Sequence, residues 1–145
     1  MDFSLTLVQA LNGLQFGVLL FLLAAGLTLV LGVMNFVNLT HGSLYMMGAY
    51  FAAALFGVSG SFFVAAVGAV ICTLLLGVIV ERVVLITLYR RDHLDQVLAT
   101  FGLILFFNEL VRIIWGPSSV YMGTPAALSG TVDVDAIGLS YPSYR

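Results

Sequence analysis

Apolar residues run almost without interruption along this chain, and glycine, proline and charged positions divide them into four segments. The segments cover residues 7–33, 43–57, 62–80 and 96–115. No charged residue lies between Asp2 and Glu81, and a soluble fold could not cover its surface over such a stretch. A transmembrane helix needs about 20 mainly apolar residues. The pattern therefore predicts an all-α fold, a polytopic helical bundle with about four transmembrane spans.

Composition excludes several classes of function. The chain is 61% apolar and 8% charged, whereas about a quarter of an average soluble domain is charged. It contains no lysine, so a phosphate-binding GxxxxGK[ST] loop is absent, no cofactor is expected, and any ATP would be hydrolysed by a partner. A net charge of -2 argues against nucleic acid as a ligand. The sequence contains no nucleophile paired with a base and no spacing typical of metal ligands, so nothing in it indicates an enzyme or a metal site.

Arginines set the expected orientation. Arg82, Arg90 and Arg91 lie in "ERVVLITLYRRDHLD" between the third and fourth segments, which we expect to form a loop. Short arginine-rich loops stay in the cytoplasm. Residues 1–120 would then form the transmembrane domain, with the N-terminus outside if residues 43–57, the shortest segment, cross fully; residues 121–145 would form an extracytoplasmic loop or tail. The arginines are either topology signals or a face for a cytoplasmic partner.

Polar residues gather between the first and second segments. The candidates for a translocation pathway or helix break are Asn35, Asn38, Thr40, His41, Gly42 and Tyr45. They form either an ordinary polar connection at the interface or a helix break, buried in the bundle, that lines a solvated path. The absence of lysine and arginine from "NLTHGS" favours the buried break. Because a metal needs several convergent ligands, a structural, hydrogen-bonding role is favoured for His41.

A second polar feature lies in the fourth segment. Glu109 and Arg112 are three residues apart, a spacing that predicts an ion pair on one helix face. A structural pair near the interface is favoured over a substrate or proton site.

Small residues four positions apart allow helices to approach closely in lipid. They are Gly13 and Gly17, Ala49 and Ala53, and Ala65 and Ala69. In the tail, the alternation in "TVDVDAI" predicts a short strand or an extended interfacial loop, in which Asp133 and Asp135 would be solvated.

The order of these features resembles one family. "LNGLQFGVLLFLLAAGLTLVLGVMNFVNLTHGSLYMMGAYFA" resembles the opening of the LivH-type permeases. The positions matching that family's motif are Gly32, Met34, Asn38, His41, Gly42, Tyr45, Met46, Gly48, Ala49 and Tyr50. Thr40 stands where alanine is usual. "ERVVLITLYRR" and "LATFGLILFFNELVRIIWGP" are similar to two further family stretches, although the first lacks the family's proline.

The resemblance implies a function and partners. LivH-type permeases are inner-membrane, multi-pass subunits of ABC importers for branched-chain amino acids, and their relatives serve urea and short amides. The implied partners are a second permease subunit, a cytoplasmic ABC ATPase, an extracytoplasmic solute-binding protein and membrane lipid. Family members are longer, so the chain resembles their N-terminal half. The alternative is a gradient-driven carrier or channel for a small polar solute, with Glu109 and His41 as its ion-coupling groups.

Overall fold

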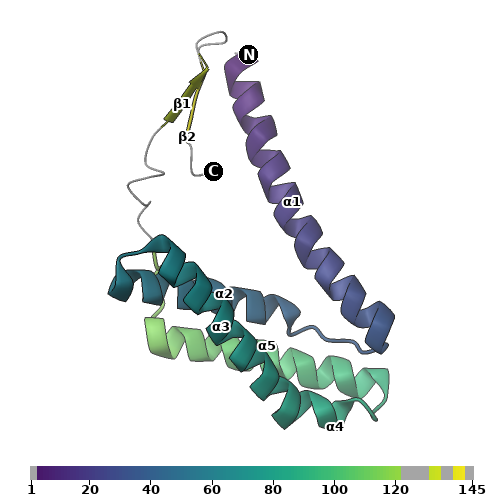
Figure 1. Cartoon of the computed structure of the whole chain (residues 1–145). Coiled ribbons are helices and arrows are strands. Elements are labelled where there is room, and N and C mark those ends of the chain that lie inside the picture. Colours follow the sequence, from purple (N-terminus) through teal and green to yellow (C-terminus); the bar gives the residue numbers. More distant parts are fainter. Residues whose placement is uncertain (1–2, 122–130, 135–138, 143–145) are drawn as a thin grey trace. The chain divides into compact units, whose positions relative to one another are not determined.

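The computed structural model describes residues 3–121, 131–134 and 139–142. The helices are α1 (Phe3–Met34), α2 (His41–Ser59), α3 (Phe62–Val80), the π-helical turn η1 (Glu81–Leu85), α4 (Ile86–Leu88) and α5 (His93–Trp115), and the strands are β1 (Thr131–Val134) and β2 (Leu139–Pro142) (Figure 1). The chain divides into two compact units, Met1–Gly26 with Gly123–Arg145, and Leu27–Met122. The second unit holds α2, α3 and α5.

Four helical stretches in the described residues are long and apolar enough to cross a membrane. They are Leu5–Met34, His41–Ser59, Phe62–Leu88 and His93–Trp115. The all-α membrane fold predicted from the apolar segments is thereby confirmed. The second stretch has 19 residues, which at a helical rise of 1.5 Å per residue spans about 28 Å. It is therefore as long as the hydrocarbon core requires, although its apolar run is short.

The connection between the third and fourth spans differs from the sequence expectation. Most of the predicted loop is helical, because η1 and α4 continue α3 to Leu88. Only residues 89–92, here named the turn, separate that helix from α5. The prediction was wrong because it took the end of the apolar run at Glu81 as the end of the helix. Glutamate and arginine are good helix formers, so the helix continues through them.

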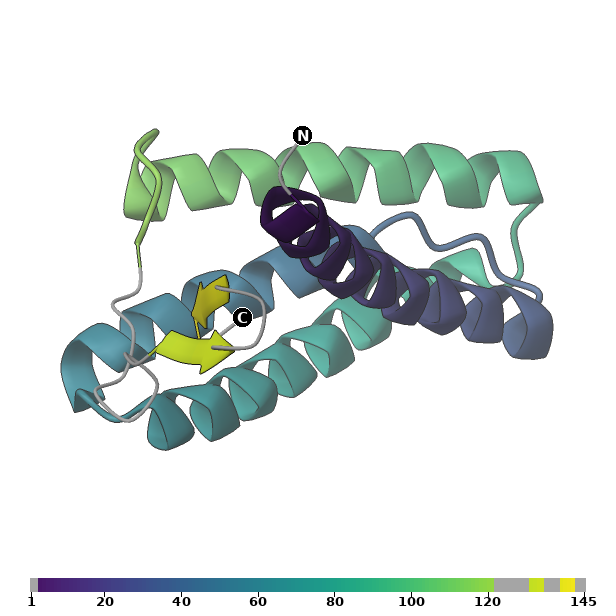
Figure 2. The ribbon, with the colours of Figure 1, turned by 90° about the horizontal axis from the view of Figure 1, so that it is seen from above.

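Small residues bring α2 and α3 together. α2 packs closely against α3 and also contacts α5 (Figure 2). Ala65 and Ala69 are buried on α3, which confirms the close packing predicted for that pair. A Cβ atom added to Gly48 of α2 would lie 3.0 Å from Thr73 Oγ1 of α3. The two helices are therefore as close as a glycine at this position allows.

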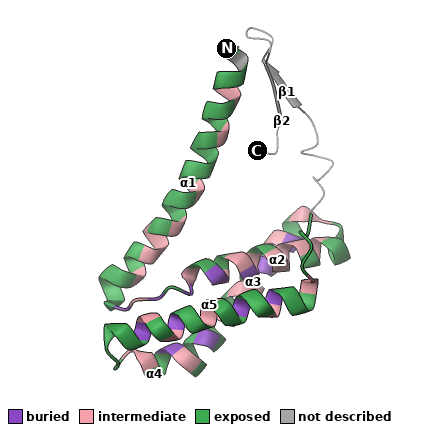
Figure 3. Cartoon of the chain, turned by 180° about the vertical axis from the view of Figure 1, so that it is seen from behind, coloured by how far each residue is buried: buried purple, intermediate pink, exposed green. Residues whose placement is uncertain are grey.

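The core of this unit lies where α2, α3 and α5 face one another. The buried residues of this core are Phe36, Met47, Val80, Leu85, Phe107 and Val111. Figure 3 shows buried positions on all three helices. The Trp115 ring lies 5.2 Å from the Tyr50 ring and 6.3 Å from the Phe51 ring, between centroids. Aromatic contacts thus join the end of α5 to the middle of α2.

Two helices end in a residue with left-handed backbone. Asn35 after α1 has φ 49° and Gly60 after α2 has φ 65°. Each donates its N–H to the carbonyl four residues earlier, at 3.0 Å to Leu31 and 2.9 Å to Phe56. Asparagine and glycine are the residues that adopt this geometry most readily. The sequence thus ends α1 at the first asparagine of the polar cluster.

The strand predicted in the tail is present. β1 pairs with β2 in antiparallel register, with Thr131 opposite Pro142 and Val134 opposite Leu139. Asp135 and residues 122–130 lie outside the described residues. The predicted extracytoplasmic position of residues 121–145 stays a prediction.

Candidate functional site

Residues 35–40, here named the break segment, interrupt the helical path between α1 and α2. Phe36, Asn38 and Thr40 are buried, whereas Leu39 is exposed. The three buried side chains are therefore turned into the bundle, and the stretch ends in a turn at Leu39 and Thr40. A polar connection and a helix break both predict a non-helical stretch here; the burial of these residues agrees with the buried break, and its role in a pathway stays a prediction.

The buried polar groups of the break segment bond to the protein. Asn38 Oδ1 accepts the Thr40 N–H at 2.9 Å, an Asx turn that orders the chain just before α2. Thr40 Oγ1 donates to the Thr100 carbonyl of α5 at 3.4 Å. Within the described part of the chain, every buried side-chain nitrogen or oxygen has a partner. In this conformation Asn38 therefore orders the break segment internally, and Thr40 joins it to α5.

Two residues of α5 accept hydrogen bonds from the break segment. Gln96 is 3% exposed and Thr100 is fully buried. Gln96 Oε1 accepts the Val37 N–H at 3.0 Å, and Thr100 Oγ1 donates to the Gln96 carbonyl at 2.7 Å. Sequence reasoning did not single out either residue. The available signal was their spacing, because polar residues four apart share one face of an otherwise apolar helix.

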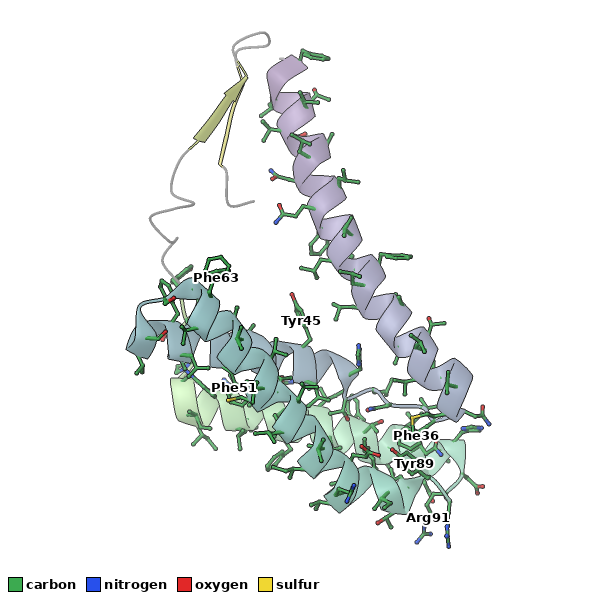
Figure 4. The ribbon with its side chains drawn as sticks, viewed as in Figure 1. Phe36, Tyr45, Phe51, Phe63, Tyr89 and Arg91 are labelled. Atoms are coloured by element: carbon green, nitrogen blue, oxygen red, sulfur yellow. The ribbon has the colours of Figure 1, made fainter. Side chains whose placement is uncertain are left out.

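Aromatic rings join the break segment to the turn. The Phe36 and Tyr89 rings meet edge to face with centroids 5.0 Å apart, and both are labelled in Figure 4. The Tyr89 hydroxyl donates to Glu81 Oε1 at 3.4 Å. Burial raises the pKa of Tyr89, and the Glu81 charge and hydrogen bond raise it further. Tyr89 is therefore neutral at physiological pH and links η1 to the break segment.

The other predicted residues of this region lie on the open side of α2. His41 is half-buried, Gly42 is exposed and Tyr45 is 49% exposed. Figure 4 shows Tyr45 directed away from α3 and α5. The His41 imidazole has no hydrogen bond within the described residues, so its expected structural bonding partner is not found there. We name Gly42, Tyr45 and the exposed Ala49 the open face of α2, because their spacing places them on one side of the helix.

The predicted ion pair on α5 is confirmed. Arg112 Nη1 lies 3.2 Å from Glu109 Oε1, with side chains 64% and 65% exposed respectively. So exposed a pair adds little to stability where water reaches it. Whether it has a transport role stays a prediction.

The cytoplasmic partner face was predicted at three arginines. Arg82, Arg90 and Arg91 are all exposed, and Arg91 extends from the turn in Figure 4. No three histidine, cysteine, aspartate or glutamate side chains come together among the described residues. The turn thus presents positive charge without a metal-ligating cluster beside it.

Four helices of membrane-spanning length and composition among the described residues define a polytopic membrane protein. Residues 9–137 match the family described as branched-chain amino acid transport system / permease component. The chain belongs to this family, and the resemblance noted in the sequence is thereby confirmed.

Curated relatives agree with the family match. The chain is 28% identical over 138 residues to the high-affinity branched-chain amino acid transport system permease protein LivH of Salmonella typhimurium, covering 89% of this chain and 44% of the relative. The LivH protein of Escherichia coli K12 is 29% identical with the same coverage. BraD of Pseudomonas aeruginosa is 29% identical over 116 residues, 74% of this chain and 38% of the relative. The chain thus spans less than half the length of these relatives. No solved structure gives a significant match.

Proposed function

We propose that this chain is part of the permease subunit of an ABC importer that moves branched-chain amino acids across the inner membrane. Membership of the permease family over residues 9–137 is the observation that carries the proposal. The relatives are named as branched-chain amino acid permeases. Their identity to this chain is modest, and the chain covers 44% of LivH, so substrate and partners are proposed for the whole protein.

In this proposal a separate cytoplasmic ATPase hydrolyses ATP, as the assignment to an ABC importer requires. Residues 1–145 include no lysine and therefore no phosphate-binding loop of the Walker type. The exposed Arg82, Arg90 and Arg91 offer the ATPase guanidinium groups for hydrogen bonds and ion pairs. A second permease subunit would complete the path, and an extracytoplasmic solute-binding protein would deliver the substrate.

The open face of α2 is the surface we assign to the translocation path. Asn38 and Thr40 are committed to bonds within the protein, whereas Tyr45 is exposed. Apart from its chain neighbours and the backbone of its own helix, no atom of the described residues lies within 4 Å of a Cβ built on Gly42. A branched-chain amino acid carries an aliphatic side chain and two charged groups. Tyr45 offers an apolar ring and a hydroxyl, while Gly42 and Ala49 leave space for the aliphatic part.

Competition for uptake tests the substrate. The full-length permease is reconstituted with its ATPase and binding protein, and uptake of labelled leucine is measured with an excess of isoleucine, valine, urea or acetamide. We expect isoleucine and valine to suppress leucine uptake and urea and acetamide to leave it unchanged. Suppression by urea or acetamide alone would assign the protein to a different substrate class.

A further inference from the structure

One side chain holds the break segment and the turn together. Gln96 Oε1 accepts the Val37 N–H at 3.0 Å and lies 3.4 Å from His93 Nδ1. Gln96 Nε2 donates to the Leu88 carbonyl at 3.3 Å and to the Arg91 carbonyl at 3.2 Å. The carboxamide therefore uses both of its N–H donors and both acceptor positions of its oxygen.

The surroundings decide which way the carboxamide points. Two carbonyl oxygens face one end of it and a backbone N–H faces the other. Only the nitrogen can donate to the carbonyls of Leu88 and Arg91, so the assignment of oxygen and nitrogen follows from the network. Because Oε1 is solely an acceptor, His93 Nδ1 must carry the proton that it shares with Gln96.

A second contact joins the same two segments independently. The Phe36 ring of the break segment packs on the Tyr89 ring of the turn. Tyr89 also bonds to Glu81 of η1. The turn is thus joined to the break segment directly by one aromatic contact and indirectly by the hydrogen bonds of Gln96.

These contacts make independent movement of the two segments unfavourable. Gln96 is 3% exposed, so water has little access to its own side chain. Pulling the turn away from the break segment would leave this buried carboxamide without partners, which is disfavoured. A force on the turn is therefore passed to the residues that lead directly into α2.

We propose that Gln96 is a positioning residue that locks the break segment to the turn, so that a cytoplasmic partner moving the turn also reorients the open face of α2. The inference rests on the proposed function, because it requires a partner that acts on the turn. It assigns a role to a residue on α5 that touches neither the open face nor the exposed arginines.

A single substitution separates the two halves of this lock. Gln96→Glu keeps an oxygen that can accept the Val37 N–H but replaces the donor to Leu88 and Arg91 with a second oxygen. An ionised carboxylate would face two carbonyl oxygens, and a protonated one could donate to only one of them, so the variant weakens the hold on the turn while it retains the break segment. Asp95→Asn is the matched control, since Asp95 is the exposed neighbour of Gln96 on the same helix.

The readout is the number of ATP molecules hydrolysed per leucine transported by the full-length permease, ATPase and binding protein in liposomes. We expect Gln96→Glu to raise this ratio at least about fivefold, the lower end of typical coupling between sites, and Asp95→Asn to leave it unchanged. An unchanged ratio in Gln96→Glu, with uptake and hydrolysis equal to the wild type or reduced in proportion, would overturn the proposal. So would an equal rise in Asp95→Asn.

Gln96→Met keeps the test decisive if Gln96→Glu does not assemble. Methionine has a similar length but removes the carboxamide's hydrogen bonds to both the break segment and the turn, and the ratio should again rise. A wild-type ratio in an assembled Gln96→Met complex would contradict the lock. Failure of the proposed function is a separate result, because the wild-type complex would then show no ATP-dependent leucine uptake at all.

Discussion

Replacing Asn38 with leucine should open the chain at the start of α2. The Asn38 side chain is 8% exposed, and its Oδ1 accepts the Thr40 N–H at 2.9 Å. Leucine is similar in size but has no acceptor, so the Thr40 N–H would be buried without a partner. The added apolar surface compensates little, because in lipid the hydrophobic effect does not drive helix packing.

The size of the effect follows from the lost bond. An unpaired buried donor costs about 1–3 kcal/mol. A loss of 1 to 2 kcal/mol raises the population of the open state by a factor of about 5 to 30. Asn38→Ser is the matched control, since a serine hydroxyl makes the same local bond more weakly. The expected order of opening is leucine above serine above the wild type.

Hydrogen exchange measures this opening directly. The full-length protein in lipid nanodiscs is compared by mass spectrometry over a peptide that covers residues 36–44, with a peptide over the α2–α3 connection as internal reference. In Asn38→Leu, exchange in the peptide over residues 36–44 should accelerate by a factor of about 5 to 30, while exchange in the reference peptide stays unchanged. Wild-type exchange at residues 36–44 in Asn38→Leu would refute the reasoning, as would equal acceleration in both peptides.

Three further substitutions test other parts of the structure. Because φ at residue 35 is 49°, Asn35→Val should lower the melting temperature of the detergent-solubilised permease by the equivalent of about 1–2 kcal/mol. Asn35→Gly should not lower it. Equal melting temperatures of the two variants would exclude the left-handed helix end. Gly48→Leu should destabilise the protein by about 1–3 kcal/mol, because the new side chain would meet Thr73. Gly57→Leu on the same helix enters open space and is the control. Equal losses of stability in the two variants would rule out the close approach of α2 and α3. His41→Leu should reduce leucine uptake more than Asp133→Asn, and a similar reduction in both would remove the case for a functional α2 start.

The spans could be predicted from the sequence because lipid imposes one requirement on all of them. A segment in hydrocarbon must be apolar and must satisfy its own backbone, which leaves long apolar helices as the solution. The ends of the helices were less predictable, because an apolar run and the helix that contains it begin and end at different residues. α2 begins at His41, two residues before its apolar run, and the third helical stretch continues past Glu81 to Leu88.

The candidate site was predictable only in part. The break segment could be predicted from its cluster of polar residues. The left-handed backbone of Asn35 agrees with the preference of asparagine for helix ends. Gln96 escaped notice because its partner Val37 is 59 residues away, and a contact at that separation leaves no local pattern. Likewise, burial of Asn38 and exposure of Tyr45 depend on how the break segment packs on α5.

The energy source of leucine uptake tests the central claim most directly. The full-length permease, its ATPase and its binding protein are reconstituted in liposomes, and leucine uptake is measured with ATP, without ATP, and with a proton or sodium gradient alone. An ABC importer permease should support uptake that requires ATP and is independent of either gradient. Uptake that persists without ATP and follows a proton or sodium gradient would contradict the account.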